Sequence, residues 1–119
     1  SCLYNYIKTK EFKSDGNSIT EDIVSSRATK NFEKALIDDA YSIDDTTALT
    51  VLFDLIEKEG LSLGTSSGIN VAGAIKLAQE LGPNKTIVTI LCDKSDRYQG
   101  KLFNKKFLIE KNLPYPSWL

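Results

Sequence analysis

The run Thr86-Ile87-Val88-Thr89-Ile90-Leu91-Cys92 constrains the fold of this chain more than any other feature. It is almost continuous in β-branched and apolar side chains, the composition of a strand that is buried on both faces of a sheet. Such a strand needs a covering layer on each face, which is typical of parallel sheets flanked by helices. The run therefore predicts the α/β fold class.

A very short strand and a helix precede this run. Leu61-Ser62-Leu63 predicts the strand, and a helix is expected over about 68–81, where Gly82-Pro83 ends it. A strand, a helix and a second strand at this spacing are typical of a βαβ crossover. We therefore predict a βαβ unit at about 61–92, as part of an open parallel sheet in a three-layer domain.

The clearest helical pattern lies over residues 44–59. Its apolar side chains recur at the i, i+3, i+4 and i+7 positions of one face, at Leu49, Leu52, Phe53 and Ile56. Asp44 or Asp45 can cap the N-terminus of this helix. Gly60 stands where a left-handed C-terminal cap is expected.

The sequence patterns that predict secondary structure are weaker in the first 34 residues. Residues 3–12 predict a short helix, and 13–18 are rich in residues that favour turns. Residues 21–34 show no clean period, so we expect a loop there. Because the 119 residues contain no repeat, low-complexity tract or linker, we predict one domain segment, 1–119, with no internal boundary.

Charge and hydropathy exclude several classes of function. Lys and Arg total 15 against 16 Asp and Glu, so no net positive charge is available to attract nucleic acid or acidic lipid. No apolar run approaches the roughly 20 residues that span a bilayer, and the first residues lack the pattern of a secretory signal. We expect no nucleic-acid or membrane partner, and a cytoplasmic location.

The chain contains no histidine. This removes Ser-His and Cys-His nucleophile pairs and histidine metal sites. Its two cysteines, Cys2 and Cys92, have no metal-type spacing, so no metal site is predicted. Any chemistry must depend on carboxylates, lysines, hydroxyls or an external cofactor.

Two segments meet the description of a ligand site. In open parallel sheets, ligands bind outside the carboxyl ends of the strands, often at a helix N-terminus. Residues 64–68 lie between the short strand and the helix, and Cys92-Asp93 ends the second strand. If the strands are neighbours, both segments face one crevice. Their small polar side chains suit holding a ligand rather than attacking it.

Simpler interpretations fit the same residues. Ser66 or Ser67, placed before a helix, can be an N-cap. The glycines can be turn residues, and Asp93 can be a solvated strand end. Without the wider sequence, Gly-Thr-Ser-Ser-Gly is a weak motif.

The wider sequence resembles the later part of cysteine synthases. Gly64-Thr65-Ser66-Ser67-Gly68 matches the family's Gly-x-Ser-Ser-Gly stretch. The likeness continues in the family's order and spacing through Ser18-Ile19-Thr20-Glu21, Ile37-Asp38-Asp39-Ala40-Tyr41, the run from Thr86 to Asp93, Arg97-Tyr98, Leu102-Phe103-Asn104 and the ending Leu113-Pro114-Tyr115-Pro116-Ser117-Trp118-Leu119.

The resemblance implies a pyridoxal-phosphate enzyme that makes L-cysteine from O-acetylserine and sulfide by β-replacement. Ser66 takes the place of the serine that hydrogen-bonds the pyridine nitrogen of the cofactor, and Gly64, Thr65 and Asp93 belong to the same cofactor-binding site. A neutral hydroxyl does not force the ring nitrogen to be protonated, so the ring is a weaker electron sink than one paired with a carboxylate. A weaker sink suits elimination followed by addition of a nucleophile.

Three parts of the family's active site are absent from these 119 residues. They are the Schiff-base lysine in a Ser-x-Lys-Asp-Arg context, the Thr-Ser-Gly-Asn-Thr substrate loop and the Gly-Thr-Gly-Gly-Thr phosphate loop. We therefore assign no catalytic residue, expect the chain alone to be inactive, and expect the missing N-terminal part of the enzyme as its partner. The resemblance also implies a homodimer whose cleft can receive the C-terminal peptide of serine acetyltransferase.

The chain departs from the family pattern at two places. Asp22-Ile23-Val24 stands where Gly-Ile-Gly is usual, and Ser95 stands where a glycine is usual. Losing both loop glycines restricts the backbone and adds a carboxylate, so an impaired enzyme is one hypothesis. A non-catalytic remnant with a binding role is an alternative. A related β-replacing enzyme such as cystathionine β-synthase is another, although the 114–119 ending fits a cysteine synthase better.

Overall fold

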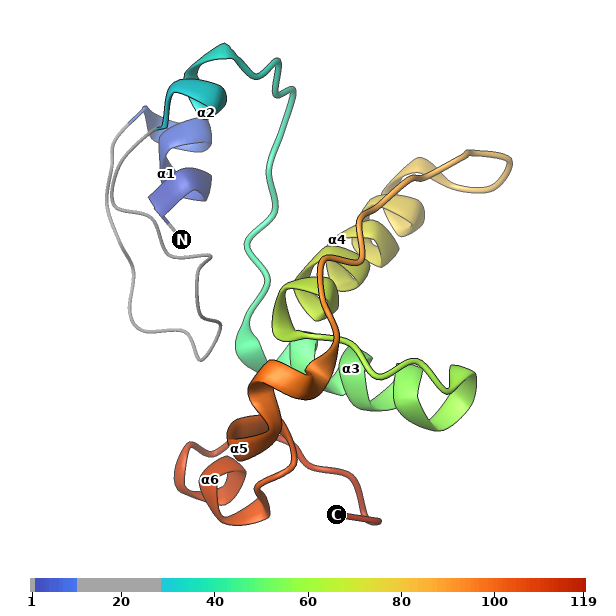
Figure 1. Cartoon of the computed structure of the whole chain (residues 1–119). Helices are drawn as coiled ribbons and strands as arrows, with labels where there is room; N and C mark the ends of the chain where they lie inside the picture. The colour runs from blue at the N-terminus through green and yellow to red at the C-terminus, as the bar shows by residue number, and fades with distance from the viewer. Residues whose placement is uncertain (1, 11–28) are drawn as a thin grey trace. The chain divides into compact units, whose positions relative to one another are not determined.

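The computed structural model describes residues 2–10 and 29–119 (Figure 1). The chain divides into two compact units, Ser1–Ser42 and Ile43–Leu119. Each unit is built from short helices and extended connections. The predicted site falls entirely in the second unit.

The first unit holds α1 (Cys2–Thr9) and α2 (Lys30–Lys34). α1 matches the helix predicted near the start of the chain. α2 shows that the loop expected over 21–34 is wrong for its last residues, because Thr29 caps a helical turn by accepting a hydrogen bond from the Phe32 N–H. The altered 22–24 loop lies outside the described residues.

The longest helices of the second unit are α3 (Asp45–Glu59) and α4 (Thr65–Leu81). The predicted caps of α3 are confirmed. The Asp44 side chain accepts a hydrogen bond from the Thr47 N–H at 2.7 Å, and Gly60 ends the helix with a φ of 67°. α4 begins three residues earlier than the helix expected from about residue 68, and Gly82 ends it.

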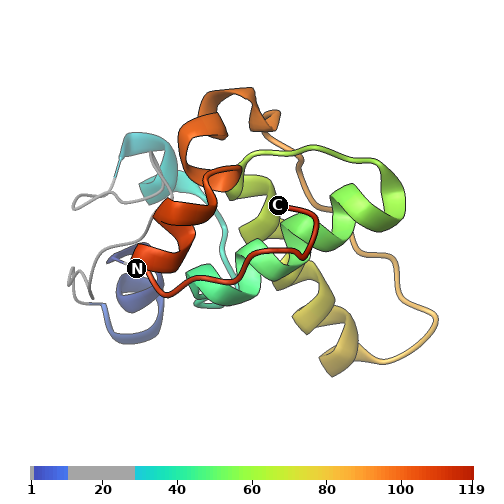
Figure 2. The ribbon, with the colours of Figure 1, turned by 90° about the horizontal axis from the view of Figure 1, so that it is seen from below.

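An apolar core forms where α3 crosses α4 (Figures 1 and 2). The predicted apolar face of α3 supplies much of it, since Leu49, Leu52 and Phe53 are buried. Gly68 is the point of closest approach on α4: a Cβ placed there would lie 2.6 Å from Leu52 Cγ and 2.8 Å from the Ala48 carbonyl oxygen. The close packing of α3 against α4 therefore depends on the absence of a side chain at Gly68.

Three short helices follow the segment after α4. They are a 3₁₀ turn, η1 (Ser95–Tyr98), and the helices α5 (Gln99–Leu102) and α6 (Lys105–Glu110). Tyr98, Leu102 and Leu108 are buried and extend the core. The Trp118 ring meets the Phe53 ring edge-on, with centroids 6.1 Å apart. Within the described ranges, no helix combines the length and apolar character that crossing a bilayer requires.

The predicted strands do not form in the described residues. Leu63 and Lys94 make an isolated antiparallel bridge, and residues 85–93 are extended without strand hydrogen bonding. A strand exists only through hydrogen bonds to a neighbouring strand, and the described chain supplies none beside 86–92. The parallel βαβ unit and the open sheet are therefore not confirmed here, whereas the helix between the two predicted strands is present.

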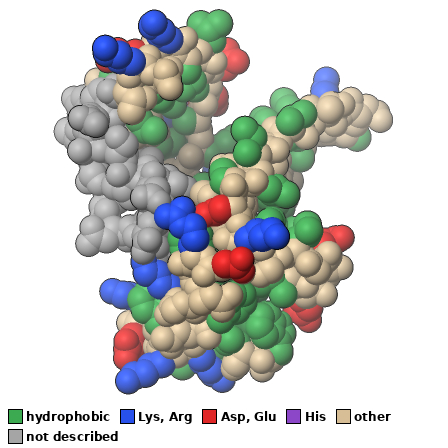
Figure 3. Space-filling model, viewed as in Figure 1, with side chains coloured by type: hydrophobic (Ala, Val, Ile, Leu, Met, Phe, Trp, Pro, Cys, Tyr) green, Lys and Arg blue, Asp and Glu red, His purple; other side chains and the backbone are tan. Residues whose placement is uncertain are grey.

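The segment over 86–92 instead forms an exposed arm with α4. It turns back beside this helix, and hydrophobic side chains gather along the arm on the face shown in Figure 3. Val88 is 87% exposed and Ile90 70% exposed. Such side chains are normally buried in a sheet. In this structure the 86–92 segment is therefore largely exposed, unlike a strand at the centre of a sheet.

A glycine-to-alanine pair in α4 tests the packing at Gly68. Gly68→Ala is expected to lower the free energy of unfolding by about 1–3 kcal/mol, because the new methyl group collides with α3. Gly73→Ala, in the same helix but with open space around its Cβ position, is expected to raise it by about 0.5–1 kcal/mol. Urea unfolding followed by circular dichroism measures both. Stabilisation by Gly68→Ala would show that the two helices do not pack closely there.

A second prediction concerns the Asp44 cap. The hydrogen bonds from Thr47, above all from its backbone N–H, lower the pKa of Asp44. Since the folded pKa lies below the unfolded one, the stabilisation is present at neutral pH and is lost as the pH falls through the folded value. Asp44→Ala is expected to lower the free energy of unfolding by about 1 kcal/mol at pH 7 and by less near pH 2.5. Urea titrations at both pH values measure this difference. Asp44→Asn keeps a capping side chain but does not titrate. If Asp44→Ala lowers the free energy of unfolding equally at both pH values, the cap does not depend on the charge of Asp44.

Candidate cofactor-binding site

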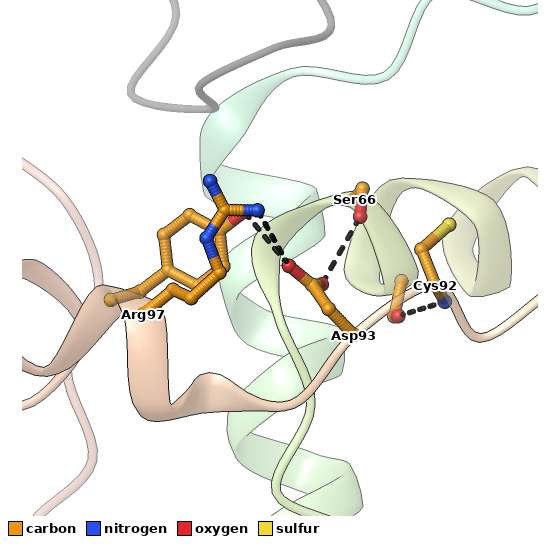
Figure 4. A network of polar contacts seen from close by, with 6 residues as sticks. Ser66, Cys92, Asp93 and Arg97 are labelled. Atoms are coloured by element: carbon orange, nitrogen blue, oxygen red, sulfur yellow. Dashed lines mark hydrogen bonds and ion pairs between the residues drawn. The ribbon is translucent and has the colours of Figure 1, made fainter.

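Hydrogen bonds of the backbone join the two segments that were predicted to meet. The Gly64 N–H donates to the Asp93 carbonyl oxygen at 2.9 Å. The Cys92 N–H donates to Ser67 Oγ at 3.0 Å, as Figure 4 shows. Both bonds connect the start of α4 to the end of the 86–93 segment. The meeting of the two segments at one place is confirmed, and hydrogen bonds from α4 hold it without a sheet in the described residues.

Ser67 is a structural residue of this junction. Its side chain is fully buried, and its hydroxyl serves the backbone of another segment rather than the first turn of its own helix. Asn70, one turn further along α4, donates from Nδ2 to the Ile90 carbonyl oxygen at 2.9 Å. Ser67 and Asn70 thus hold the returning segment against the first two turns of α4.

The interpretation of Ser66 or Ser67 as an N-cap is wrong. Gly64 is the N-cap, it has no side-chain cap, and both serines lie inside the first turn. The Gly64 carbonyl oxygen accepts hydrogen bonds from the N–H groups of Ser67 and Gly68. The hydroxyls of the serines are therefore available for contacts outside the helix.

Asp93 is the charged centre of the site (Figure 4). Ser66 Oγ donates to Asp93 Oδ1 at 3.5 Å, and the Tyr98 hydroxyl donates to Asp93 Oδ2 at 3.1 Å. Arg97 Nη1 lies 3.8 Å from Oδ2. The Asp93 side chain is only 24% exposed, so its interactions are less weakened by solvent than those on an open surface. The interpretation of Asp93 as a freely solvated strand end is wrong.

Gly64 leaves room for this carboxylate. A Cβ at Gly64 would lie 2.0 Å from Asp93 Oδ1 and 2.8 Å from the Tyr98 ring. No side chain can therefore be accommodated there without moving Asp93. The glycine is required by the site rather than by a turn alone, because its φ of −76° is open to any residue.

Tyr98 is a site residue that the sequence reasoning did not single out. It is buried, and this burial, followed by the hydrogen bond to Asp93, raises the pKa of its phenol. Tyr98 therefore keeps its proton at neutral pH and acts as a donor to the carboxylate. The Arg97-Tyr98 string was the only available signal, and nothing in its local pattern indicates which residue Tyr98 contacts.

Thr65 carries a buried hydroxyl without a hydrogen bond. Its side chain lies close to the Tyr98 hydroxyl, but Oγ1 makes no hydrogen bond of normal geometry with any described residue. Buried hydroxyls are usually paired, so this one is suited to a polar ligand atom or a water molecule.

Ser95 forms hydrogen bonds with Ser62 beside the site. Its hydroxyl lies 2.6 Å from the Ser62 hydroxyl, and its N–H donates to the Ser62 carbonyl oxygen at 3.3 Å. Ser95 is buried, although a glycine is usual at this place in the family that the sequence resembles. The serine side chain therefore adds one hydrogen bond, between its hydroxyl and that of Ser62, which a glycine could not form.

Clusters of metal-binding side chains and free thiols bear on the chemistry that the described residues can support. No group of three or more metal-binding side chains occurs in 2–10 and 29–119, and Cys92 is a free, exposed thiol. The site offers hydroxyls, one carboxylate and the N-terminus of a long helix. Hydroxyls and a carboxylate of this kind are suited to hydrogen-bonding a polar ligand.

A matched pair of serine variants tests the division of roles in α4. Ser67→Ala is expected to lower the free energy of unfolding by about 1–2 kcal/mol, since it leaves the Cys92 N–H without its acceptor. Ser66→Ala is expected to change it by less than about 0.5 kcal/mol, because the Ser66 hydroxyl makes only a long hydrogen bond. Both replacements gain the same helix propensity. Equal effects in urea unfolding would contradict the proposed division.

Comparison with known proteins identifies relatives of this chain. Residues 2–93 match the family described as pyridoxal-phosphate dependent enzyme. Cysteine synthase 1 of Neurospora crassa is 38% identical over 117 residues, which are 95% of this chain and 31% of that protein. Cysteine synthase 2 of Schizosaccharomyces pombe is 41% identical over 99 residues, 82% of this chain and 25% of that protein.

A further relative is named for a different activity. The O-acetylserine dependent cystathionine beta-synthase of Bacillus subtilis is 36% identical over 69 residues, which are 58% of this chain and 22% of that protein. The chain thus spans less than a third of the length of each of these curated relatives.

Proposed function

The chain belongs to the family of pyridoxal-phosphate dependent enzymes, and we propose that it is the C-terminal segment of a cysteine synthase. In this proposal residues 1–119 form one part of the cofactor-binding domain. The complete enzyme makes L-cysteine from O-acetylserine and sulfide by β-replacement. The anchoring lysine and the phosphate loop come from the missing N-terminal part.

The observation that carries the proposal is the junction of residues 64–67 with Cys92 and Asp93. It places the half-buried Ser66 hydroxyl in the first turn of α4, beside the Asp93 carboxylate. A hydroxyl in this position can form a hydrogen bond with the nitrogen of a heteroaromatic ring. The two cysteine synthases among the relatives support the choice of reaction.

Each residue has a defined task in this site. Ser66 binds the ring nitrogen, and the partial positive charge at the start of α4 lies beside it. Gly64 lets the Asp93 carboxylate lie against the start of α4, and Ser67 holds the returning segment so that Ser66 and Asp93 keep their separation. When bound, pyridoxal phosphate supplies an electron sink for breaking and forming bonds at the β-carbon of the substrate.

The proposal also accounts for the exposed segment 86–92. We propose that residues 86–92 become a strand of an open parallel sheet once neighbouring strands are present, which would give the predicted βαβ unit at about 61–92. Its exposed Val88 and Ile90 then become buried. A homodimer, a site for the C-terminal peptide of serine acetyltransferase and a cytoplasmic location stay predictions from the resemblance.

A second candidate activity is cystathionine formation. The Bacillus subtilis relative favours this activity. That relative is named as an O-acetylserine dependent cystathionine beta-synthase, and its match covers more than half of this chain. A non-catalytic remnant with a binding role is a further alternative. Residues 64–68 keep the Gly-x-Ser-Ser-Gly motif, which argues against a remnant that no longer binds the cofactor.

Activity of the full-length protein and its Ser66→Ala variant tests the proposal. With pyridoxal phosphate, O-acetylserine and sulfide, the full-length protein is expected to form cysteine and to retain the visible absorbance of the cofactor after dialysis. Ser66→Ala removes one hydrogen bond to the ring, so we expect about a tenfold or greater loss of cofactor affinity. Thr50→Ala, a change at an exposed residue of α3 that contacts no residue of the site, serves as the control.

Three outcomes would decide between the candidates. Cysteine formation with a Ser66-dependent cofactor affinity supports the cysteine synthase. Product from homocysteine in place of sulfide would favour the cystathionine synthase. Absence of cofactor absorbance in the full-length protein would contradict both and leave a binding role.

A further inference from the structure

The Asp93 carboxylate has three donor side chains around it, and they differ in distance. The Tyr98 hydroxyl lies nearest, 3.1 Å from Oδ2. Arg97 Nη1 lies 3.8 Å from the same oxygen, and its side chain is 64% exposed, so solvent weakens the attraction. Ser66 Oγ lies 3.5 Å from Oδ1, longer than the roughly 2.5–3.0 Å that is usual between hydrogen-bonded oxygens (Figure 4). Tyr98 is therefore the main partner of the carboxylate, and the Ser66 hydroxyl is only weakly engaged.

The fold holds the Tyr98 hydroxyl at this carboxylate. The Tyr98 side chain is buried, and its ring packs against the backbone of Gly64, where an added Cβ would lie 2.8 Å from it. The Thr65 hydroxyl also lies beside the Tyr98 hydroxyl, but it is neutral. A carboxylate is a stronger acceptor than a neutral hydroxyl, so the phenol proton goes to Asp93. Burial, followed by the hydrogen bond to Asp93, raises the pKa of Tyr98, so this donor persists at neutral pH.

Hydrogen bonds also fix the backbone on both sides of the Asp93 side chain. The Gly64 N–H donates to the Asp93 carbonyl oxygen at 2.9 Å. Two residues later, the Ser95 N–H donates to the Ser62 carbonyl oxygen at 3.3 Å, and the hydroxyls of these serines lie 2.6 Å apart. With the backbone tied to residues 62–64, the position of the carboxylate depends on the rotation of its own side chain and on the donors that hold it.

We infer that Tyr98 is a positioning residue that satisfies the Asp93 carboxylate and thereby keeps the Ser66 hydroxyl free to bind the ring nitrogen of the cofactor. The inference rests on the proposed function for the identity of the ligand. Without the phenol hydroxyl, Oδ2 loses its donor although the Asp93 side chain is only 24% exposed, and rotation brings the carboxylate to the Ser66 hydroxyl. A serine hydroxyl has one proton, so a hydroxyl that donates to Asp93 cannot donate it to a ligand.

The test is a double-mutant cycle on the affinity of the full-length protein for pyridoxal phosphate. Tyr98→Phe removes the hydroxyl and keeps the ring that packs against Gly64. We expect it to raise the Kd of pyridoxal phosphate about tenfold, the effect of losing one hydrogen bond to the ring. In an Asp93→Ala background no carboxylate competes for Ser66. There Tyr98→Phe is expected to change the Kd by less than about twofold, so the double variant binds more tightly than Tyr98→Phe alone.

Tyr115→Phe is the matched control. It removes the same hydroxyl from a tyrosine that is 43% exposed and whose ring lies beside Lys105, and it is expected to leave the Kd unchanged. Equal losses from Tyr98→Phe with and without the Asp93 carboxylate would overturn the inference, because they would show that Tyr98 acts through packing alone. An unchanged Kd in Tyr98→Phe would overturn it too. A wild-type protein that binds no pyridoxal phosphate would instead overturn the proposed function, on which the inference rests.

A crystal structure of the wild-type holoenzyme decides the matter if Tyr98→Phe does not fold. The inference predicts the Tyr98 hydroxyl on the Asp93 carboxylate and Ser66 Oγ closer to the ring nitrogen than to either carboxylate oxygen. A Ser66 hydroxyl within about 3 Å of the carboxylate, or a Tyr98 hydroxyl that binds elsewhere, would contradict it.

Discussion

The junction between the start of α4 and the end of the 86–93 segment is the interaction on which the site depends. Its hydrogen bonds include one from the Gly64 N–H to the Asp93 carbonyl, one from the Cys92 N–H to Ser67 Oγ and one from the Asn70 side chain to the Ile90 carbonyl. Together they fix the distance between Ser66 and the Asp93 carboxylate. Every functional group discussed for this chain lies within a few residues of this junction.

Two glycines make the arrangement possible, and both act through the absence of a side chain. Gly68 lets α3 approach α4, which anchors the first turns of the helix. Gly64 lets the Asp93 carboxylate and the Tyr98 ring approach that same helix end. Because neither glycine has a positive φ, close packing rather than unusual backbone geometry explains them. The core and the site are therefore coupled through the position of α4.

Sequence reasoning succeeds here where the cause is local. Asp44 and Gly60 were predicted as caps because capping depends on residues within one helical turn. The serines at the start of α4 were misplaced as caps, since the Gly64 backbone serves instead. The contact of Tyr98 with Asp93 and the hydrogen bond between the Ser62 and Ser95 hydroxyls depend on tertiary packing, which no local pattern reveals. The strand over 86–92 needs partners that the described residues do not supply.

The central claim is that Ser66, held by this junction, contacts the ring nitrogen of pyridoxal phosphate. A crystal structure of the full-length protein with the bound cofactor tests it most directly. The account predicts Ser66 Oγ within hydrogen-bonding distance of the ring nitrogen, with the Gly64–Asp93 and Ser67–Cys92 hydrogen bonds retained. A ring nitrogen that contacts a different residue, or a cofactor bound away from the start of α4, would contradict it.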